Sequence, residues 1–191
     1  LSVAGLSKRT TPSVVERVAS TLAEGKVVAR CAGGMEWGPR ALGNRSILAA
    51  PFDPEINQWL NDRLKRSEFM PFAPVVRAED VERWFMGVGK APESARFMTV
   101  CFDVTPEFQE VAPAAVHVDG TARPQVVSAE ANPGLHAVLT AFGEKTGVPV
   151  LINTSFNMHE EPMVRTPTDA IRAWKASGIE ALWLGDHLLK Q

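Results

Sequence analysis

The chain has 191 residues, of which 45% are hydrophobic, and this is the size of one ordinary domain with a substantial core. Its 20 lysine and arginine residues nearly balance 22 aspartate and glutamate residues, which gives a formal net charge of -2. This balance argues against binding of nucleic acid or an anionic membrane through overall charge, so any anion site must be local. No stretch approaches the roughly 20 apolar residues of a membrane span, and the first residues lack a signal-peptide core, which predicts a cytoplasmic protein.

The two cysteines, Cys31 and Cys101, lie far apart and have no CxxC partner. Their spacing predicts neither a disulfide framework nor a zinc cluster. We expect two buried free thiols.

In the first half of the chain, capping signals and apolar periodicity predict helices separated by short strands. Thr-Pro and Asp-Pro pairs open the first two helices, because a capping side chain followed by proline suits a helix start. The predicted helices are 12–24, a second one that carries Ile56, Trp59, Leu60 and Leu64, and 79–86. The predicted strands are 26–31, 72–77 and 99–104, and residues 87–96 are predicted to form a surface loop.

The second half begins with residues 105–132, where prolines alternate with short β-like pieces too broken for a helix. Asn132-Pro133 then opens a helix that runs through Lys145, and VPVLIN follows as an apolar strand buried on both faces. A last helix from Thr166-Pro167 to Gly178 leads to a strand at 181–184. This irregular alternation predicts a single α/β (α+β) domain with a mixed sheet flanked by helices.

A glycine- and arginine-rich segment, GGMEWGPRALGNRS, follows the first strand at residues 33–46. Glycines let backbone N–H groups approach an anion, and the guanidinium groups of Arg40 and Arg45 offer paired donors to phosphate. The segment is not a Walker A loop, because no Gly-Lys-Ser/Thr follows. The alternatives are a phosphate cradle and a solvent loop with scattered charge.

Two further basic segments could add cations to such a site. Lys65 and Arg66 end the second helix, although cations at a helix C-terminus are also favoured by the helix dipole alone. In HVDGTARPQ, Asp119-Gly120 predicts a hairpin turn and His117 a structural hydrogen bond. Arg123 and Gln125 alternate along a short strand and so are expected on one face.

The segment NTSFN follows the buried strand and contains Asn153, Ser155 and Asn157. Ligands of open α/β sheets bind where strands leave the core, so these neutral donors suit phosphate oxygens or a purine edge. The alternative is a turn that caps the strand. The neighbouring His159-Glu160-Glu161 lacks a second spaced histidine, so no metal site is expected, and no local pattern suggests a catalytic triad.

The segments GGMEWGPRALGNRSILAAP, RSEFMPFAPVV, HVDGTARPQVV and LINTSFNMHEEPMV resemble the C-terminal region of O-carbamoyltransferases that act on Nod factors and antibiotics. The resemblance implies a YrdC-like fold that binds ATP, with nucleotide-bound Mg²⁺, and carbamoyl phosphate, and that forms carbamoyl-adenylate. An N-terminal actin-like domain, the partner implied by the family, then transfers the carbamoyl group to a hydroxyl. That domain also holds the family's iron-binding histidines, so no iron is assigned here.

The same resemblance assigns roles to eight residues. Ser155 and Asn157 look like the family's Ser-x-Asn element, which holds nucleotide phosphates with Asn153 beside it. Lys65 and Arg66 resemble the Lys-x-Arg element that grips the acyl phosphate, although here the two are adjacent. Arg40, Arg45 and Arg123 fall on motif positions that complete the anion pocket, with Lys65, Arg66 and Arg123 nearest the reacting groups.

The chain begins without methionine in what resembles a connecting segment, so we expect a piece of a longer protein. Residues 1–25 are predicted to be a linker and first helix, and 26–191 the YrdC-like domain. Two other functions remain as alternatives: a threonylcarbamoyl-adenylate synthase and an RNA-binding YrdC-like module, the latter disfavoured by the near-neutral charge.

Overall fold

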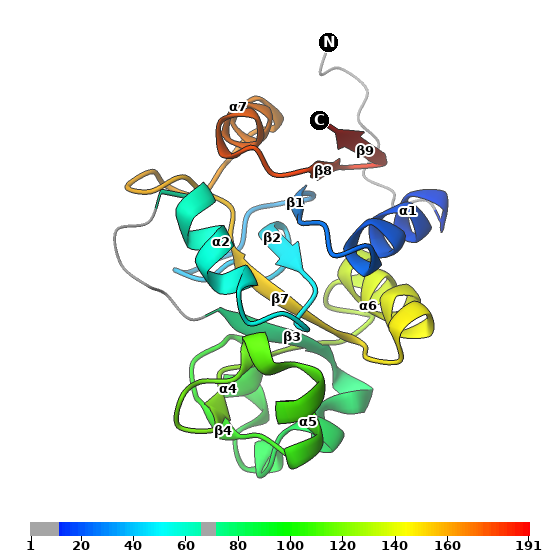
Figure 1. Ribbon diagram of the computed structural model, residues 1–191, viewed down its shortest axis with the longest axis vertical. Coiled ribbons are helices and arrows are strands. Elements are labelled where there is room, and N and C mark those ends of the chain that lie inside the picture. The colour runs from blue at the N-terminus through cyan, green and yellow to red at the C-terminus, as the bar shows by residue number, and fades with distance from the viewer. Residues whose placement is uncertain (1–11, 66–71) are drawn as a thin grey trace.

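The computed structural model describes residues 12–65 and 72–191, and their main feature is a seven-stranded sheet in the order β6-β3-β7-β2-β1-β8-β9 (Figure 1). β1 is antiparallel to β2 and parallel to β8, whereas β7 is antiparallel to both β2 and β3. The predicted mixed sheet is therefore confirmed. The strands of this sheet are β1 (Val28–Cys31), β2 (Arg45–Ala49), β3 (Ala73–Arg77), β6 (Gln125–Val127), β7 (Val150–Ser155), β8 (Ala181–Leu184) and β9 (His187–Lys190).

Helices cover both faces of the sheet, and each face has its own cluster of buried apolar side chains (Figure 1). On one face α1 and α6 lie side by side, and Val18, Leu22, Leu135 and Leu139 are fully buried there. On the other face lie α2 and α7. The helices of these two layers are α1 (Pro12–Ala23), α2 (Ile56–Arg63), α6 (Pro133–Thr146) and α7 (Pro167–Ser177).

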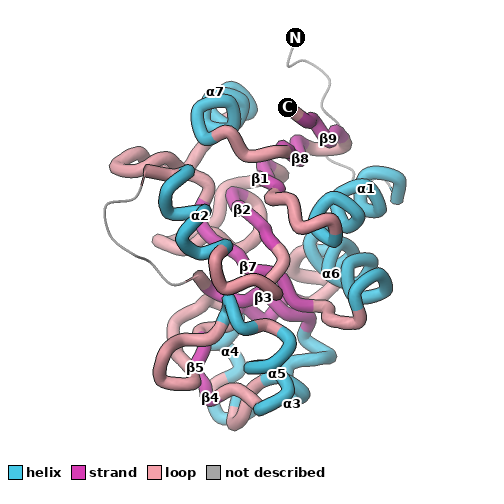
Figure 2. The backbone as a smooth tube through the Cα atoms, viewed as in Figure 1, coloured by secondary structure: helices cyan, strands magenta, loops and turns pink. Residues whose placement is uncertain are grey.

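Short elements form a small lobe beside β3, at one edge of the sheet (Figure 2). Its centre is aromatic: the ring of Phe108 lies 5.8 Å from that of Trp84 and 4.9 Å from that of Phe85. The helices of the lobe are α3 (Val81–Trp84), α4 (Pro92–Arg96) and α5 (Pro106–Val111), with the 3₁₀ turns η1 (Ala78–Asp80), η2 (Val88–Lys90) and η3 (Pro113–Ala115). A two-stranded ribbon of β4 (Phe102–Asp103) and β5 (Thr121–Ala122) completes it.

α6 and α7 appear where the sequence predicts them, and their ends carry the expected capping chemistry. Asn132 accepts a hydrogen bond from the backbone N–H of Leu135 at the start of α6, and Gly147 ends that helix in the left-handed conformation. Thr166 and Asp169 form a reciprocal capping box at the start of α7. α2 begins later than its Asp-Pro pair predicts. Asp53 accepts a hydrogen bond from the backbone N–H of Glu55, and the helix begins at Ile56.

Several short elements differ from the predictions. Residues 87–96 contain η2 and α4 where a loop was expected, and α5 lies within a segment predicted to be too broken for a helix. Both helices have proline at their first position but are too short to show apolar periodicity. The strand predicted at 99–104 is reduced to β4, and β2 and β9 were not predicted. The turn before β5 does not close the expected hairpin either, since β5 pairs with β4.

Replacement of the capping threonine tests the role of the α7 cap. Thr166→Ala removes the side-chain oxygen that accepts a hydrogen bond from the backbone N–H of Asp169, and we expect it to lower the free energy of unfolding by about 1 kcal/mol. Urea unfolding followed by circular dichroism measures the change. Thr168→Ala, at an exposed position of the same helix, is the control, and an equal loss in both variants would contradict the capping role.

Candidate functional site

The predicted site residues gather at one end of the sheet, where β1, β7 and β8 end and β2, β3 and β6 begin. Arg45 begins β2, and Ser155 ends β7 directly opposite Ser46. The backbone N–H of His159 donates to the carbonyl oxygen of Leu64, which places Lys65 close to the segment that follows β7. Arg66 lies outside the described residues.

The loop between β1 and β2 is fixed by buried side chains from three different strands. Nδ2 of Asn153 donates to the carbonyl oxygen of residue 41 at 3.0 Å, and Nε2 of Gln125 donates to that of residue 42 at 2.7 Å. Nη1 of Arg30 donates to the carbonyl oxygen of residue 43 at 2.7 Å. Asn153 and Gln125 are also joined to each other at 2.6 Å, so these side chains form one buried polar layer beneath the loop.

Arg30 was not singled out in the sequence, yet it is 3% exposed and central to this layer. Its guanidinium lies 4.1 Å from the ring of Trp183 and also donates to Asn132 Oδ1. Burial lowers the pKa of Arg30, whereas the nearby Glu36 carboxylate raises it. A buried charge of this kind is tolerated only because carbonyl, amide and aromatic groups surround it.

Arg45 also binds backbone carbonyl oxygens, but on the other face of the sheet. It is 5% exposed, and its two terminal nitrogens donate to four backbone carbonyl oxygens, those of Ala32, Gly33, Asn44 and Arg165. The segment 33–46 is therefore neither a plain solvent loop nor a loop throughout, since its last two residues start β2. The sequence alone places Arg45 in a loop, because a charged residue is not expected in a buried strand without knowledge of these backbone partners.

Arg40 and Arg123 form the cationic part of the site. Burial lowers the pKa of Arg123 and the nearby Arg40 lowers it further, while Cys101 acts in the opposite direction. Within residues 12–65 and 72–191 neither guanidinium is in a salt bridge, and Nε of Arg123 is buried without a hydrogen-bond partner. Arg123 precedes β6 and so does not share a strand face with Gln125 as predicted. Two guanidiniums that repel one another and lack a carboxylate favour the approach of an anion.

Ser155 and Asn157 form the neutral part. The Ser155 hydroxyl donates to Asn157 Oδ1 at 2.6 Å, and Asn157 Nδ2 donates to the carbonyl oxygens of Met158 and Glu161. Both side chains are half-buried. These contacts agree with the predicted turn that caps the strand, whereas binding of a ligand by this segment stays a prediction.

The predicted structural role of His117 is confirmed, since its Nδ1 lies 3.0 Å from the Thr121 hydroxyl. The prediction of two buried thiols is wrong for Cys101, which is exposed in the lobe, whereas Cys31 is buried in β1. In the described residues, no three His, Cys, Asp or Glu side chains group as a metal site, and no helix is long and apolar enough to cross a membrane.

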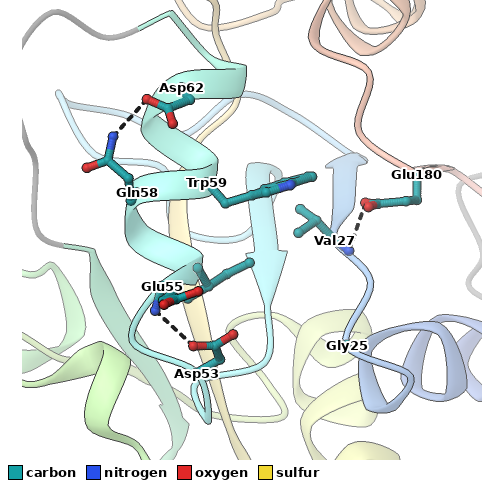
Figure 3. Close-up of a pocket in the computed structure, with 9 residues that line it drawn as sticks. Gly25, Val27, Asp53, Glu55, Gln58, Trp59, Asp62 and Glu180 are labelled. Carbon is teal, nitrogen blue, oxygen red and sulfur yellow. Dashed lines mark hydrogen bonds between the residues drawn. The ribbon is translucent and has the colours of Figure 1, made fainter.

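A cavity of about 570 Å³ lies at the opposite end of the sheet, between α2 and the starts of β1 and β8 (Figure 3). Trp59 forms its wall, and Glu180 accepts a hydrogen bond from the backbone N–H of Val27. Its charged lining residues are all acidic: Asp53, Glu55, Asp62 and Glu180. Such a lining repels phosphate, so the cavity does not compete with the sheet end for an anionic ligand.

Comparison with known proteins identifies the family of the chain. Residues 19–191 match the family model "Carbamoyltransferase C-terminus". The chain belongs to this family. It is 39% identical to nodulation protein NolNO of Sinorhizobium fredii, in an alignment that covers 93% of this chain and 26% of that protein. It is 37% identical to 3'-hydroxymethylcephem-O-carbamoyltransferase of Amycolatopsis lactamdurans, with 90% and 32% covered. The chain thus spans about a third or less of these relatives.

Two solved structures share the fold of this carbamoyltransferase C-terminal domain. Full-length HypF in its phosphate- and nucleotide-bound form has a TM-score of 0.61 at 22% identity, over 91% of this chain and 25% of HypF. A variant of P. abyssi Sua5 has a TM-score of 0.61 at 14% identity, over 93% and 50% of the two chains. The predicted YrdC-like fold is confirmed by these neighbours.

Glycine substitutions test how tightly the loop is fixed. Gly43 has a φ of +113°, and a Cβ there would lie 2.6 Å from Leu135 and 2.9 Å from Asn132 at the start of α6. We expect Gly43→Ala to lower the free energy of unfolding by more than the roughly 1–3 kcal/mol of backbone strain alone. Gly38→Ala has the strain without the clash, and Gly34→Ala has neither. Urea unfolding of the three variants should rank them in that order, and equal losses would contradict close packing of the loop.

Thiol labelling tests the placement of the two cysteines. Burial raises the pKa of Cys31 and also blocks access to it, so iodoacetamide at pH 8 should alkylate only Cys101 in the native chain. Mass spectrometry should show one label in the wild type and in Cys31→Ser, and none in Cys101→Ser. Two fast-reacting thiols in the native chain would refute the buried position of Cys31.

Proposed function

We propose that this chain is the part of an O-carbamoyltransferase that binds ATP and carbamoyl phosphate and forms carbamoyl-adenylate. Family membership supports the reaction class. The observation that carries the site is that Arg40 and Arg123 bring two guanidiniums to this end of the sheet, with no salt bridge to either among the described residues and with Arg123 Nε buried without a partner. The neighbouring HypF structure is of a phosphate- and nucleotide-bound form. The proposal places the same kinds of ligand at the sheet end of this chain.

The chemistry requires charge control more than a protein nucleophile. Carbamoyl phosphate yields carbamate and phosphate with water, and a carbamate oxygen then attacks the α-phosphorus of ATP. A new P–O bond forms as the bond to the β-phosphate breaks, and pyrophosphate leaves. Because both reactants are anionic, fixed cations and neutral donors must bring them together.

Each residue of the site has a role in this proposal. Arg40 and Arg123 neutralise the phosphates, and Lys65, with the predicted help of Arg66, binds the acyl phosphate. Ser155 and Asn157 donate to or orient phosphate oxygens at the end of β7. Asn153 and Arg45 position the loop of the site, because they donate hydrogen bonds to backbone carbonyl oxygens. Mg²⁺ would enter with the nucleotide, held mainly by the phosphates.

Transfer of the carbamoyl group to a hydroxyl is assigned to the N-terminal actin-like domain of such enzymes. The chain covers 32% of the cephem carbamoyltransferase and 26% of the nodulation protein, which is consistent with a division of the reaction between domains. We therefore expect this chain to activate carbamate without completing the transfer.

Ligand-induced stabilisation tests the binding. ATP with Mg²⁺ at about 100 times its Kd should raise Tm by about 5–10 °C, since such saturation stabilises the native state by about 2.7 kcal/mol. Arg123→Ala and Ser155→Ala should remove the shift, whereas Lys175→Ala, an exposed cation on α7, should retain it. An unchanged Tm of the wild type at millimolar ATP would count against the proposal.

Pyrophosphate release identifies the substrate class. Release should depend on ATP and carbamoyl phosphate together and should not need threonine. Release that requires threonine and bicarbonate would instead assign the chain as a threonylcarbamoyl-adenylate synthase. RNA binding with steep salt dependence would favour the RNA-binding alternative.

A further inference from the structure

The loop between β1 and β2 already contains an anion of its own, the carboxylate of Glu36. Its Oε1 accepts hydrogen bonds from the backbone N–H groups of Leu42 at 2.9 Å, Asn44 at 2.5 Å and Arg45 at 3.0 Å. Clustered N–H groups of this kind form the concave sites in which proteins bind phosphate. The glycine-rich segment therefore builds an anion site, and a side chain of the same segment occupies it.

Other backbone groups near the end of the loop are also in use. The N–H of residue 43 donates to the Ser46 hydroxyl at 2.9 Å, and the carbonyl oxygens of residues 41–43 accept from the buried polar layer. The carbonyl oxygen of residue 44 accepts from Arg45. An incoming phosphate thus finds the backbone donors of residues 42–45 already occupied.

We infer that Glu36 is a positioning residue: its carboxylate is a permanent internal anion that fixes the loop and directs the ligand's phosphates to Arg40 and Arg123. The part that concerns the ligand rests on the proposed function. The part that concerns the loop rests only on the contacts of Glu36.

Charge and geometry both favour a permanent role over a displaceable one. The carboxylate raises the pKa of the buried Arg30, whereas Arg45, on the other face of the sheet, lowers it. Without Glu36 the repulsion between these two buried guanidiniums would be offset less. Three donors on one oxygen hold the carboxylate more firmly than the single ion pairs at the surface do. Loss of this carboxylate should loosen the loop that carries Arg40.

Two variants separate the shape of Glu36 from its charge. Glu36→Gln keeps an oxygen where Oε1 accepts its three hydrogen bonds and places the amide nitrogen where Oε2 is buried without a partner among the described residues. Glu36→Ala removes the acceptor and leaves a small site lined by N–H groups. Glu110→Ala, at an exposed position of α5, is the matched control for loss of one carboxylate.

The experiment compares ATP affinity, Tm and amide hydrogen exchange in these variants. Glu36→Ala should bind ATP about 10- to 100-fold more weakly, because the loop and Arg40 are no longer held in place. Glu36→Gln should lose about 2- to 10-fold, and Glu110→Ala should match the wild type. The amide hydrogens of Leu42, Asn44 and Arg45 should exchange faster in Glu36→Ala than in the wild type.

Chemical rescue gives the sharpest result. Sodium formate should fill the emptied site in Glu36→Ala, raise its Tm, slow exchange of the three amides and recover ATP affinity. Sodium chloride at equal ionic strength and the bulkier pivalate should have little effect. In Glu36→Gln and the wild type, formate should act no better than chloride, because the site is occupied.

Opposite results would overturn the inference. If Glu36→Ala binds ATP as tightly as or more tightly than the wild type, the N–H groups are the ligand's own phosphate site and Glu36 competes for it. If formate changes neither Tm nor amide exchange in Glu36→Ala, the internal-anion role is wrong.

Should the wild type fail to bind ATP, the proposed function fails, and the formate and exchange measurements still decide the role of Glu36. If Glu36→Ala does not fold, Glu36→Gln with wild-type affinity and exchange contradicts the contribution of the charge.

Discussion

The structure depends on one constraint: the carbonyl oxygens of residues 41–43 must each meet a buried donor. Those donors are Arg30, Gln125 and Asn153, which come from β1, β6 and β7. A buried polar group without a partner costs more than its hydrogen bond contributes, so the strands and the loop are stable only in one relative position. This layer connects the order of the sheet to the shape of the site.

The same constraint separates two kinds of arginine. Arg30 and Arg45 are enclosed by carbonyl and amide oxygens, so their charge is used within the chain. Arg40 lowers the pKa of Arg123, and neither has such an enclosure in the described residues. The acidic cavity around Trp59 lies at the far end of the sheet. The two ends of the strands thus differ in charge, and under the proposed function an anionic ligand is attracted to the end that carries Arg40 and Arg123.

The sequence predicts the parts of the fold whose signals are local. α6 and α7 have caps, prolines and stop glycines within a few residues of their ends, α1 has proline and glycine near its ends, and all three appear at the predicted places. α4 and α5 carry proline at their starts but end before periodicity can show. β2 was missed for a different reason. Its first two residues are polar, and they are buried only because distant carbonyls and a neighbouring strand satisfy them.

The candidate site shows the same limit at the level of single side chains. Local pattern identified residue types suited to an anion and placed Asn153 and Ser155 near a strand end, but it could not show where their polar atoms point. That direction is set by partners far away in the chain, such as the carbonyl oxygen 112 residues from Asn153. Glu36 was overlooked because an acid within an anion-binding motif looks out of place. Its contacts give the reason for it: a loop rich in N–H groups needs a fixed anion of its own if the ligand is to be bound by side chains.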